Sequence, residues 1–273
     1  MSLNILVLVK QVPDTRCVGP DAMTPEGTVN RAALPAIFNP DDLAALEMAL
    51  RLKEEHERSR ITVLTMGLPK AAEVLRESLY RGADDAVLLT DRALGGADTL
   101  ATSYALACAI RKIGKPDLIL CGRQAIDGDT AQVGPQVAEK LALPQVTCVE
   151  RIEQLADGRV SLVRRIDGGV ERVEAPVPCL LTIVGDAAKC RPCNAKLVLT
   201  HKHAEPAPDG VMRQWSAADI DADLEQCGLK GSPTKVKAVQ NIVFKAKESR
   251  RLTADEAELD GLMKELIANH IIG

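Results

Sequence analysis

The residues best suited to chemistry form a polar, glycine-bounded loop, Gly122-Arg123-Gln124-Ala125-Ile126-Asp127-Gly128-Asp129-Thr130-Ala131-Gln132-Val133-Gly134. An apolar run at 117–121 precedes it, and a helical pattern over 131–143 follows it. Open α/β sheets bind ligands at this kind of place, between the carboxyl end of a strand and a helix N-terminus. Gly122, Gly128 and Gly134 carry no Cβ and so permit close approach of a bound group. The loop therefore predicts a phosphate site facing the N–H groups of 129–132, with a purely structural connection as the alternative.

Two acidic residues in this loop count against a bare phosphate site. Asp127 and Asp129 carry the same sign of charge as phosphate. They are therefore expected to bond a ribose or to order the loop backbone. Asp129 has a further possible role as the cap of the following helix.

Three other segments are expected at the same edge of the sheet. Lys10 to Thr15 follows the apolar run 5–9, and Met66-Gly67 closes the run 61–66. Asn39-Pro40-Asp41-Asp42 opens a helix with a good N-cap, a favoured first residue and two acids that suit the helix dipole. A purely structural helix start, with no ligand, explains these four residues equally well. Because carboxyl ends of parallel strands share one rim, the convergence of these segments predicts a nucleotide site.

Alternating strand and helix patterns fill the first half of the chain. Apolar runs at 5–9, 61–66, 86–90 and 117–121 are separated by helical patterns, which predicts parallel strands with right-handed crossovers. The fold class is thus α/β, with a doubly wound, mostly parallel, Rossmann-like sheet.

The pattern then changes. Short alternating segments at 150–155, 160–166 and 170–174 are separated by Asp157-Gly158 and Asp167-Gly168-Gly169, which are hairpin signals. They predict an antiparallel extension, and 177–184 is one more buried strand.

Periodicity fades from about residue 186. Pro206 to Gly210 is typical of a linker. Thr253-Ala254-Asp255-Glu256 has the form of a capping box for a final helix, which packs on the parent domain or on a partner. We divide the chain into a nucleotide-binding domain (1–185), a partner-recognition loop with linker (186–210) and a C-terminal arm (211–273).

Composition excludes several classes of protein. The net charge of −4 and the lack of a basic stripe argue against nucleic-acid binding. No apolar run approaches the roughly 18 residues that cross a bilayer, so no membrane insertion is expected. Four of the eight cysteines, Cys108, Cys121, Cys148 and Cys179, lie in apolar or strand-like runs and are expected in the core. Because the sequence shows no secretory leader, we expect free thiols in the cytoplasm.

One cysteine pair has the spacing of a metal site. Cys190-Arg191-Pro192-Cys193 is followed by His201 and His203, but these histidines lack the usual separation of zinc ligands. A redox pair and ordinary surface cysteines are the alternatives, and we expect no metal. The chain has no dinucleotide fingerprint, P-loop or nucleophile elbow, so no catalytic residue is assigned.

At these loops the chain resembles the beta subunit of electron transfer flavoproteins. The resemblance spans about residues 4–185 and is carried by Leu8 to Thr15, Asn39 to Asp42, Glu47 to Lys53, Met66-Gly67, Gly82 to Asp85, Cys121 to Pro135 and Asp167 to Gly169.

The resemblance implies a heterodimer. The alpha subunit carries most contacts to FAD, and the beta subunit binds AMP or, in electron-bifurcating members that oxidise NADH, a second FAD. Ordinary members perform no bond-making catalysis and carry electrons from a flavoprotein dehydrogenase to a downstream acceptor. By position the site is Leu8, Asn39, Pro40, Asp41, Asp42, Met66, Gly122, Arg123, Gln124, Ala125, Ile126, Asp127, Gly128, Asp129, Thr130, Gln132, Val133 and Gly134.

Two details refine the resemblance. Val12 to Thr15 and Arg123 to Thr130 look more like the bifurcating branch than the AMP-binding one. The family's recognition loop corresponds to 187–203, where no aromatic residue is present and Asn194 stands near the expected leucine. We therefore expect an unusual dehydrogenase partner.

Two readings of other classes compete with this one. A stand-alone adenine-nucleotide-binding regulatory domain would need a self-contained glycine-rich triphosphate loop, which is lacking here. A nucleotide-activating hydrolase or ligase would need a serine-glycine-glycine phosphate loop, which is also lacking.

Overall fold

The computed structural model describes residues 2–14, 35–234, 251–253 and 255–272. The chain divides into two compact units, Met1–Lys237 and Ala238–Gly273. Thr15, which belongs to one of the segments of the resemblance, lies outside the described residues.

A nine-stranded sheet forms the first unit, with strand order β11-β5-β4-β1-β6-β10-β7-β8-β9. Neighbours from β11 to β7 are parallel. The parallel strands are β1 (Asn4–Leu8), β4 (Arg60–Met66), β5 (Asp85–Leu89), β6 (Leu118–Gly122), β7 (Gln145–Ala156), β10 (Cys179–Ile183) and β11 (Met212–Trp215). A separate antiparallel pair consists of β2 (Gln11–Pro13) and β3 (Ala36–Phe38).

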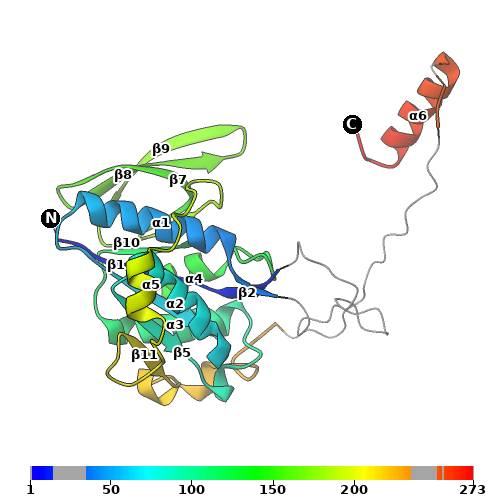
Figure 1. Cartoon of the computed structure of the whole chain (residues 1–273). Coiled ribbons are helices and arrows are strands. Elements are labelled where there is room, and N and C mark those ends of the chain that lie inside the picture. The colour runs from blue at the N-terminus through cyan, green and yellow to red at the C-terminus, as the bar shows by residue number, and fades with distance from the viewer. Residues whose placement is uncertain (1, 15–34, 235–250, 254, 273) are drawn as a thin grey trace. The chain divides into compact units, whose positions relative to one another are not determined.

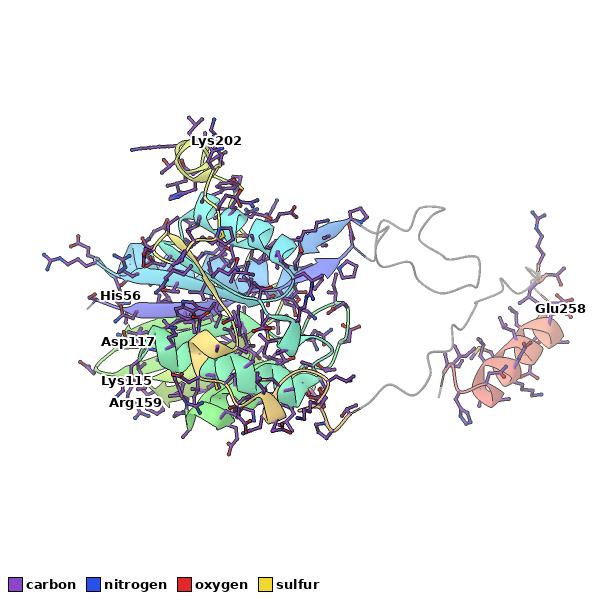
Figure 2. All side chains as sticks on the ribbon, turned by 90° about the horizontal axis from the view of Figure 1, so that it is seen from below. His56, Lys115, Asp117, Arg159, Lys202 and Glu258 are labelled. Carbon is purple, nitrogen blue, oxygen red and sulfur yellow. The ribbon has the colours of Figure 1, made fainter. Side chains whose placement is uncertain are left out.

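Helices cover both faces of this sheet (Figures 1 and 2). On one face, α1 (Pro40–Glu55) and α2 (Ala72–Arg81) share an apolar core with Val7 and Val63. On the other, α3 (Thr99–Ile113) and α4 (Val133–Leu141) share a core with Leu6 and Leu64. Burial on both faces explains why the parallel strands are continuous apolar runs rather than alternating ones. The predicted doubly wound α/β fold is confirmed.

The antiparallel extension is also confirmed. The long strand β7 pairs with β8 (Arg159–Ile166), which pairs with β9 (Gly169–Pro176). Asp157 and Gly158, which join β7 to β8, have φ values of 51° and 71°. Both residues are thus left-handed, as the tight turn of a two-residue hairpin requires.

Two elements lie where periodicity fades in the sequence. The helix α5 (Ala195–His201) packs against α2, and β11 pairs with β5 at the edge of the sheet. The segment 206–210 therefore joins two elements of one unit, which continues well beyond the boundary we placed at 211. A four-residue edge strand is too short for its pattern to stand out in the sequence. The three-part division by function stays a prediction.

The connection from β10 to α5 is fixed by charged groups. The Arg191 guanidinium bonds the carboxylates of Glu47 and Glu54 on α1, with Nε 3.0 Å from Glu47 Oε2. Asn194 caps α5 by accepting from the N–H groups of Lys196 and Leu197. The described part of this unit also contains four short 3-10 helices, at 69–71, 92–94, 218–220 and 224–226.

The second unit contains α6 (Glu256–Ala268). The predicted capping box is wrong, because Asp255 is the N-cap and the Thr253 backbone N–H donates to Glu258 rather than to Glu256. Leu259, Met263 and Ile267 are exposed on this helix. Their spacing of four residues places them on one side of it. Within the described part of the chain, every helix is too short or too polar to cross a bilayer.

Candidate functional site

Three neighbouring strands end at one edge of the sheet and bring the predicted segments together. Leu8, Met66 and Gly122 are the last residues of β1, β4 and β6, which lie side by side in the order β4-β1-β6. The start of α1 contacts the same edge through the bonds described next. We call this edge, with the loop 122–134 and residues 39–42, the rim. Figure 2 labels Lys115 and Asp117, which precede β6, at the opposite end of the sheet.

The buried carboxylate of Asp42 ties the rim together. Its Oδ2 accepts from the Lys10 N–H and its Oδ1 from the Gly122 N–H, each at 2.9 Å. The pKa of Asp42 is raised to about 7, chiefly by burial and to a smaller extent by the charge of Asp41, while the hydrogen bonds to the carboxylate oppose this rise. One side chain therefore joins the ends of β1 and β6 to the first turn of α1.

Asn39 stands at the N-cap position of α1 but does not cap it, contrary to our expectation. Its Nδ2 donates to the Gln124 carbonyl at 2.9 Å, and its Oδ1 accepts from the Ile126 N–H at 3.2 Å. The residue has no exposed surface. Both polar atoms of its side-chain amide therefore bond the backbone of the loop.

The loop's two acids have partners within the chain. Lys10 Nζ lies 2.7 and 2.8 Å from the oxygens of Asp127, and Gln124 Nε2 donates to Asp129 at 2.8 Å. Asp129 does not cap α4, whose N-cap is Gln132. These bonds favour the loop-ordering role that the sequence left open for the acids.

Asp41 is the second carboxylate at the start of α1. Its Oδ2 is buried without a hydrogen bond among the described residues, and Arg123 Nε lies 4.0 Å away. Burial raises the pKa of Asp41, partly offset by the Gln124 N–H and the Arg123 charge. A Cβ at Gly185, after β10, would stand 2.2 Å from Asp41 Oδ1, so Gly185 belongs to the rim as well.

The glycines of the loop serve different neighbours. A Cβ at Gly122 would lie 2.5 Å from Asp42 Oδ1, and one at Gly134 would lie 2.8 Å from Cys121 Sγ. A Cβ at Gly128 would meet nothing within 4 Å. Side chains of the protein itself lie close to Gly122 and Gly134, and the expected close approach of a ligand to these glycines stays a prediction.

Several backbone N–H groups of the loop have no acceptor within the described part of the protein. The Asp129 N–H is taken by the Ala125 carbonyl at 2.9 Å, but among the described residues the N–H groups of Thr130 to Gly134 meet no protein acceptor. Asp129 and Ala131 have φ values of 49° and 52°, a left-handed backbone that non-glycine residues adopt at a cost. Consecutive free amides before and at a helix start suit a phosphate or another anion.

Other predicted residues contribute less directly. Leu8 is 6% exposed, so its side chain belongs to the core and its backbone to the rim. The Gln132 side chain accepts from the Thr99 hydroxyl at the start of α3. Our list of site residues omitted Lys10 and Gly185. A lysine directly after the first strand and a glycine directly after the last apolar run were the signals for them.

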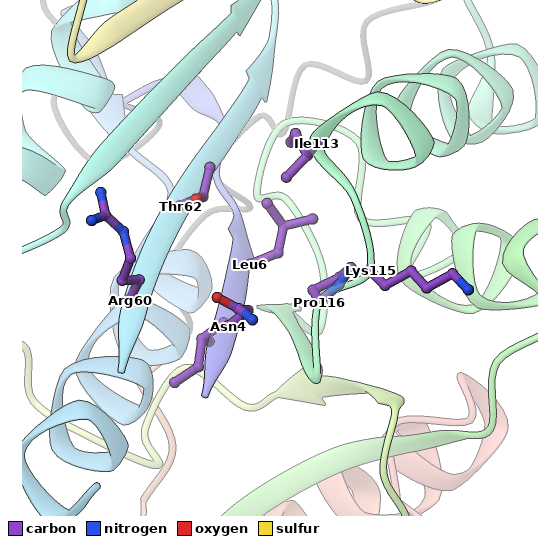
Figure 3. Close-up of a pocket in the computed structure, with 8 residues that line it drawn as sticks. Asn4, Leu6, Arg60, Thr62, Ile113, Lys115 and Pro116 are labelled. Atoms are coloured by element: carbon purple, nitrogen blue, oxygen red, sulfur yellow. The ribbon is translucent and has the colours of Figure 1, made fainter. Parts of the chain in front are cut away.

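Two cavities lie away from the rim. The first, of about 240 Å³, is lined by Asn4, Leu6, Arg60 and Lys115 among others and lies at the opposite end of β1 (Figure 3). The second, of about 450 Å³, lies between α1 and the strand β7. Neither cavity contains a predicted site residue. Ligands of open α/β sheets bind at the carboxyl ends of strands, so the rim remains the better candidate.

The cysteine pair is held by an arginine. Arg81 Nη1 lies 2.9 Å from Cys193 Sγ, and burial raises the pKa of Cys190. Within the described ranges, no three His, Cys, Asp or Glu side chains are placed to share a metal ion. The bonds from this segment to α1 and α2 hold it in place, which gives the cysteine-containing loop a structural role.

These features define an α/β protein whose polar loops meet at the carboxyl ends of parallel strands, and comparison with known proteins specifies its family. Residues 26–219 match the model of the electron transfer flavoprotein domain. The electron transfer flavoprotein subunit beta of Clostridium acetobutylicum is 49% identical over 86% of both chains. The caffeyl-CoA reductase-Etf complex subunit CarD of Acetobacterium woodii is 47% identical over 86% of both.

A third relative matches from end to end. The acryloyl-CoA reductase electron transfer subunit gamma of Anaerotignum propionicum is 41% identical over 99% of this chain and 100% of its own. The chain therefore belongs to the electron transfer flavoprotein family, as a beta subunit. Its role is electron transfer, and membership implies association with a flavin.

Exchange of Gly122 for alanine tests the packing of the rim. The added methyl group collides with Asp42 and Asp41, and such overpacking costs about 1–3 kcal/mol. Urea unfolding is expected to show this loss for Gly122→Ala. Gly128→Ala, whose methyl group enters open space, is the matched control, and an equal loss in both variants contradicts the packing argument.

The raised pKa of Asp42 predicts a pH-dependent stability. Between pH 4 and 7 the unfolded carboxyl ionises while the folded one keeps its proton, so this group makes the free energy of unfolding fall as pH rises, and the loss is complete above about 7. Relative to Asp42→Asn, the free energy of unfolding of the wild type should therefore fall over that window, by at most about 1.4 kcal/mol per pH unit. Urea unfolding at pH 5, 6, 7 and 8 measures it; parallel curves for the two proteins speak against the buried, protonatable carboxyl.

Proposed function

We propose that this beta subunit forms a heterodimer with an electron transfer flavoprotein alpha subunit and binds an adenine nucleotide at the rim. The observation that carries the proposal is the run of free amides at Thr130 to Gly134, on a loop held in place by Asn39 and Asp42. Free amides before a helix suit the phosphates of AMP or FAD. The cytoplasmic location expected from the sequence is part of this proposal.

The residues of this chain would bind and orient the nucleotide rather than react with it. The amides of Thr130 to Gly134 would donate to its phosphate oxygens, and Lys10 and Arg123 are cations of the rim that bond or face its acids. A second FAD would supply a redox-active isoalloxazine ring, whereas AMP would be redox-inert. The FAD held mainly by the alpha subunit would carry the electrons in either case.

The alpha subunit is proposed to cover α6. Leu259, Met263 and Ile267 are 45%, 48% and 54% exposed on this helix. An apolar face of this kind gains stability when a partner removes it from water. The acids at 256, 258, 260 and 265 keep the rest of the helix polar.

The electron donor is proposed to dock at α5. Leu199 is 69% exposed there, while Asn194, near the position of the family's leucine, is committed to capping the helix. The Asn194 N–H donates to the Tyr80 carbonyl and fixes α5 to α2. Two relatives are named as subunits of CoA reductase complexes, so we propose a reductase of CoA esters as the partner class, in line with the unusual partner expected from the sequence.

A second FAD is favoured over AMP in the rim. The segment from Val12 to Asp14 and the loop from Arg123 to Thr130 resemble the bifurcating branch of the family. In that case the heterodimer, with its alpha subunit, would oxidise NADH and split the electron pair between two acceptors.

Co-expression with an electron transfer flavoprotein alpha subunit tests the proposal. The complex should be a yellow heterodimer, and mass spectrometry of the released ligands should count two FAD and no AMP. A result of one FAD and one AMP rules out the two-flavin form but supports the proposal of an electron-carrying heterodimer. A colourless homodimer rejects the proposal in favour of a stand-alone regulatory domain.

A further inference from the structure

Asn39 and Asp42 form one buried network behind the loop. Asn39 has no exposed surface and Asp42 is 6% exposed. Four hydrogen bonds join the two side chains to backbone groups: Asn39 bonds Gln124 and Ile126, and Asp42 accepts from Lys10 and Gly122. The Asn39 side chain also hydrogen-bonds the Asp42 carboxylate. Both side chains therefore point at protein, and none of these polar atoms faces solvent.

The network fixes the loop at its beginning and at its turn. Gly122 ends β6, and Gln124 and Ile126 follow within four residues. The next turn closes with the Gly128 and Asp129 N–H groups on the Ala125 carbonyl. The free amides of Thr130 to Gly134 come immediately after this fixed stretch, so their direction depends on it. A loop that is ordered before binding loses less conformational entropy when the ligand arrives.

We infer that Asn39 and Asp42 are positioning residues of the nucleotide site, which order the loop from behind and make no contact with the ligand. This inference rests on the proposed nucleotide site and departs from the binding role that the family resemblance gives to the two side chains. Contact with the ligand is left to the loop amides and to the cations at the rim.

The introduction of a carboxyl group at residue 39 separates positioning from contact. In Asn39→Asp an ionised oxygen replaces the donor that faces the Gln124 carbonyl, which breaks that bond. When protonated, the new carboxyl donates through its O–H to Gln124 and still accepts from Ile126. Charged groups on the packed elements are Asp41 and Asp42 on α1, Lys10 after β1, Arg123, Asp127 and Asp129 in the loop, and Asp186 after β10. The adjacent acids Asp41 and Asp42 favour the protonated form of the new carboxyl.

The experiment uses the heterodimer with its alpha subunit. Amide hydrogen exchange over 122–126 is measured without added nucleotide, and affinities for AMP and for FAD are measured from pH 5.5 to 8.5. At pH 8.5 Asn39→Asp should exchange faster and bind roughly tenfold or more weakly, because a buried bond is lost. The ratio to wild type should recover toward one as pH falls.

Matched variants distinguish the outcomes. Asp42→Asn, nearly isosteric, should also accelerate exchange over 122–126 if Asn39→Asp does not fold. Asp98→Ala is the control: it removes an acceptor for the Ala101 and Thr234 N–H groups at another helix start and should leave hydrogen exchange over 122–126 unchanged. Weaker binding with unchanged exchange in the nucleotide-free protein overturns the inference and indicates ligand contact. Wild-type protein that binds neither AMP nor FAD rejects the proposed function itself.

Discussion

The rim depends on a single buried carboxylate. Asp42 has almost no contact with water, and its carboxylate accepts hydrogen bonds from two backbone N–H groups at the ends of β1 and β6, which lie side by side. A carboxylate left unpaired in such a place would be strongly unfavourable. The raised pKa shows that the compensation is incomplete. The same bond explains why Gly122 is a glycine, since any Cβ there would occupy the space of the carboxylate oxygen.

Electrostatic balance within the rim follows from that arrangement. Each exposed cation is close to an acid, Lys10 to Asp127 and Arg123 to Asp41. Acids near a phosphate site are a difficulty only when their charge is uncompensated, and here Lys10 and Gln124 bond the two acids of the loop. What the rim offers to an anion is backbone dipoles, which carry no mobile charge and need no rearrangement to act.

The segments proposed to meet partners are attached to this scaffold in different ways. The connection to α5 is held by the Arg191 guanidinium between two glutamates of α1, one of them buried. Burial raises the pKa of Glu47, but the bonds from Arg191 and Arg51 lower it more, so this carboxyl stays ionised at neutral pH. With its connection fixed in this way, α5 would present one defined surface to the proposed donor, whereas α6 carries an exposed apolar face that the proposed alpha subunit would cover.

The sequence alone determined the strands at 5–9, 61–66, 86–90 and 117–121, the two hairpins, the fold class and the family, because apolar runs and turn residues are local signals. It also placed the four segments of the rim together, since parallel strands share a carboxyl end. Tertiary structure decided which atoms meet. The Asn39 amide reaches a carbonyl 85 residues away and the Asp42 carboxylate an N–H 80 residues away. By local rules Asn39 is a helix cap, and only the adjacency of β1 and β6 makes a loop carbonyl its partner. The strand β11 could not be predicted from the sequence for the same reason, because these four residues form a strand only through their pairing with β5.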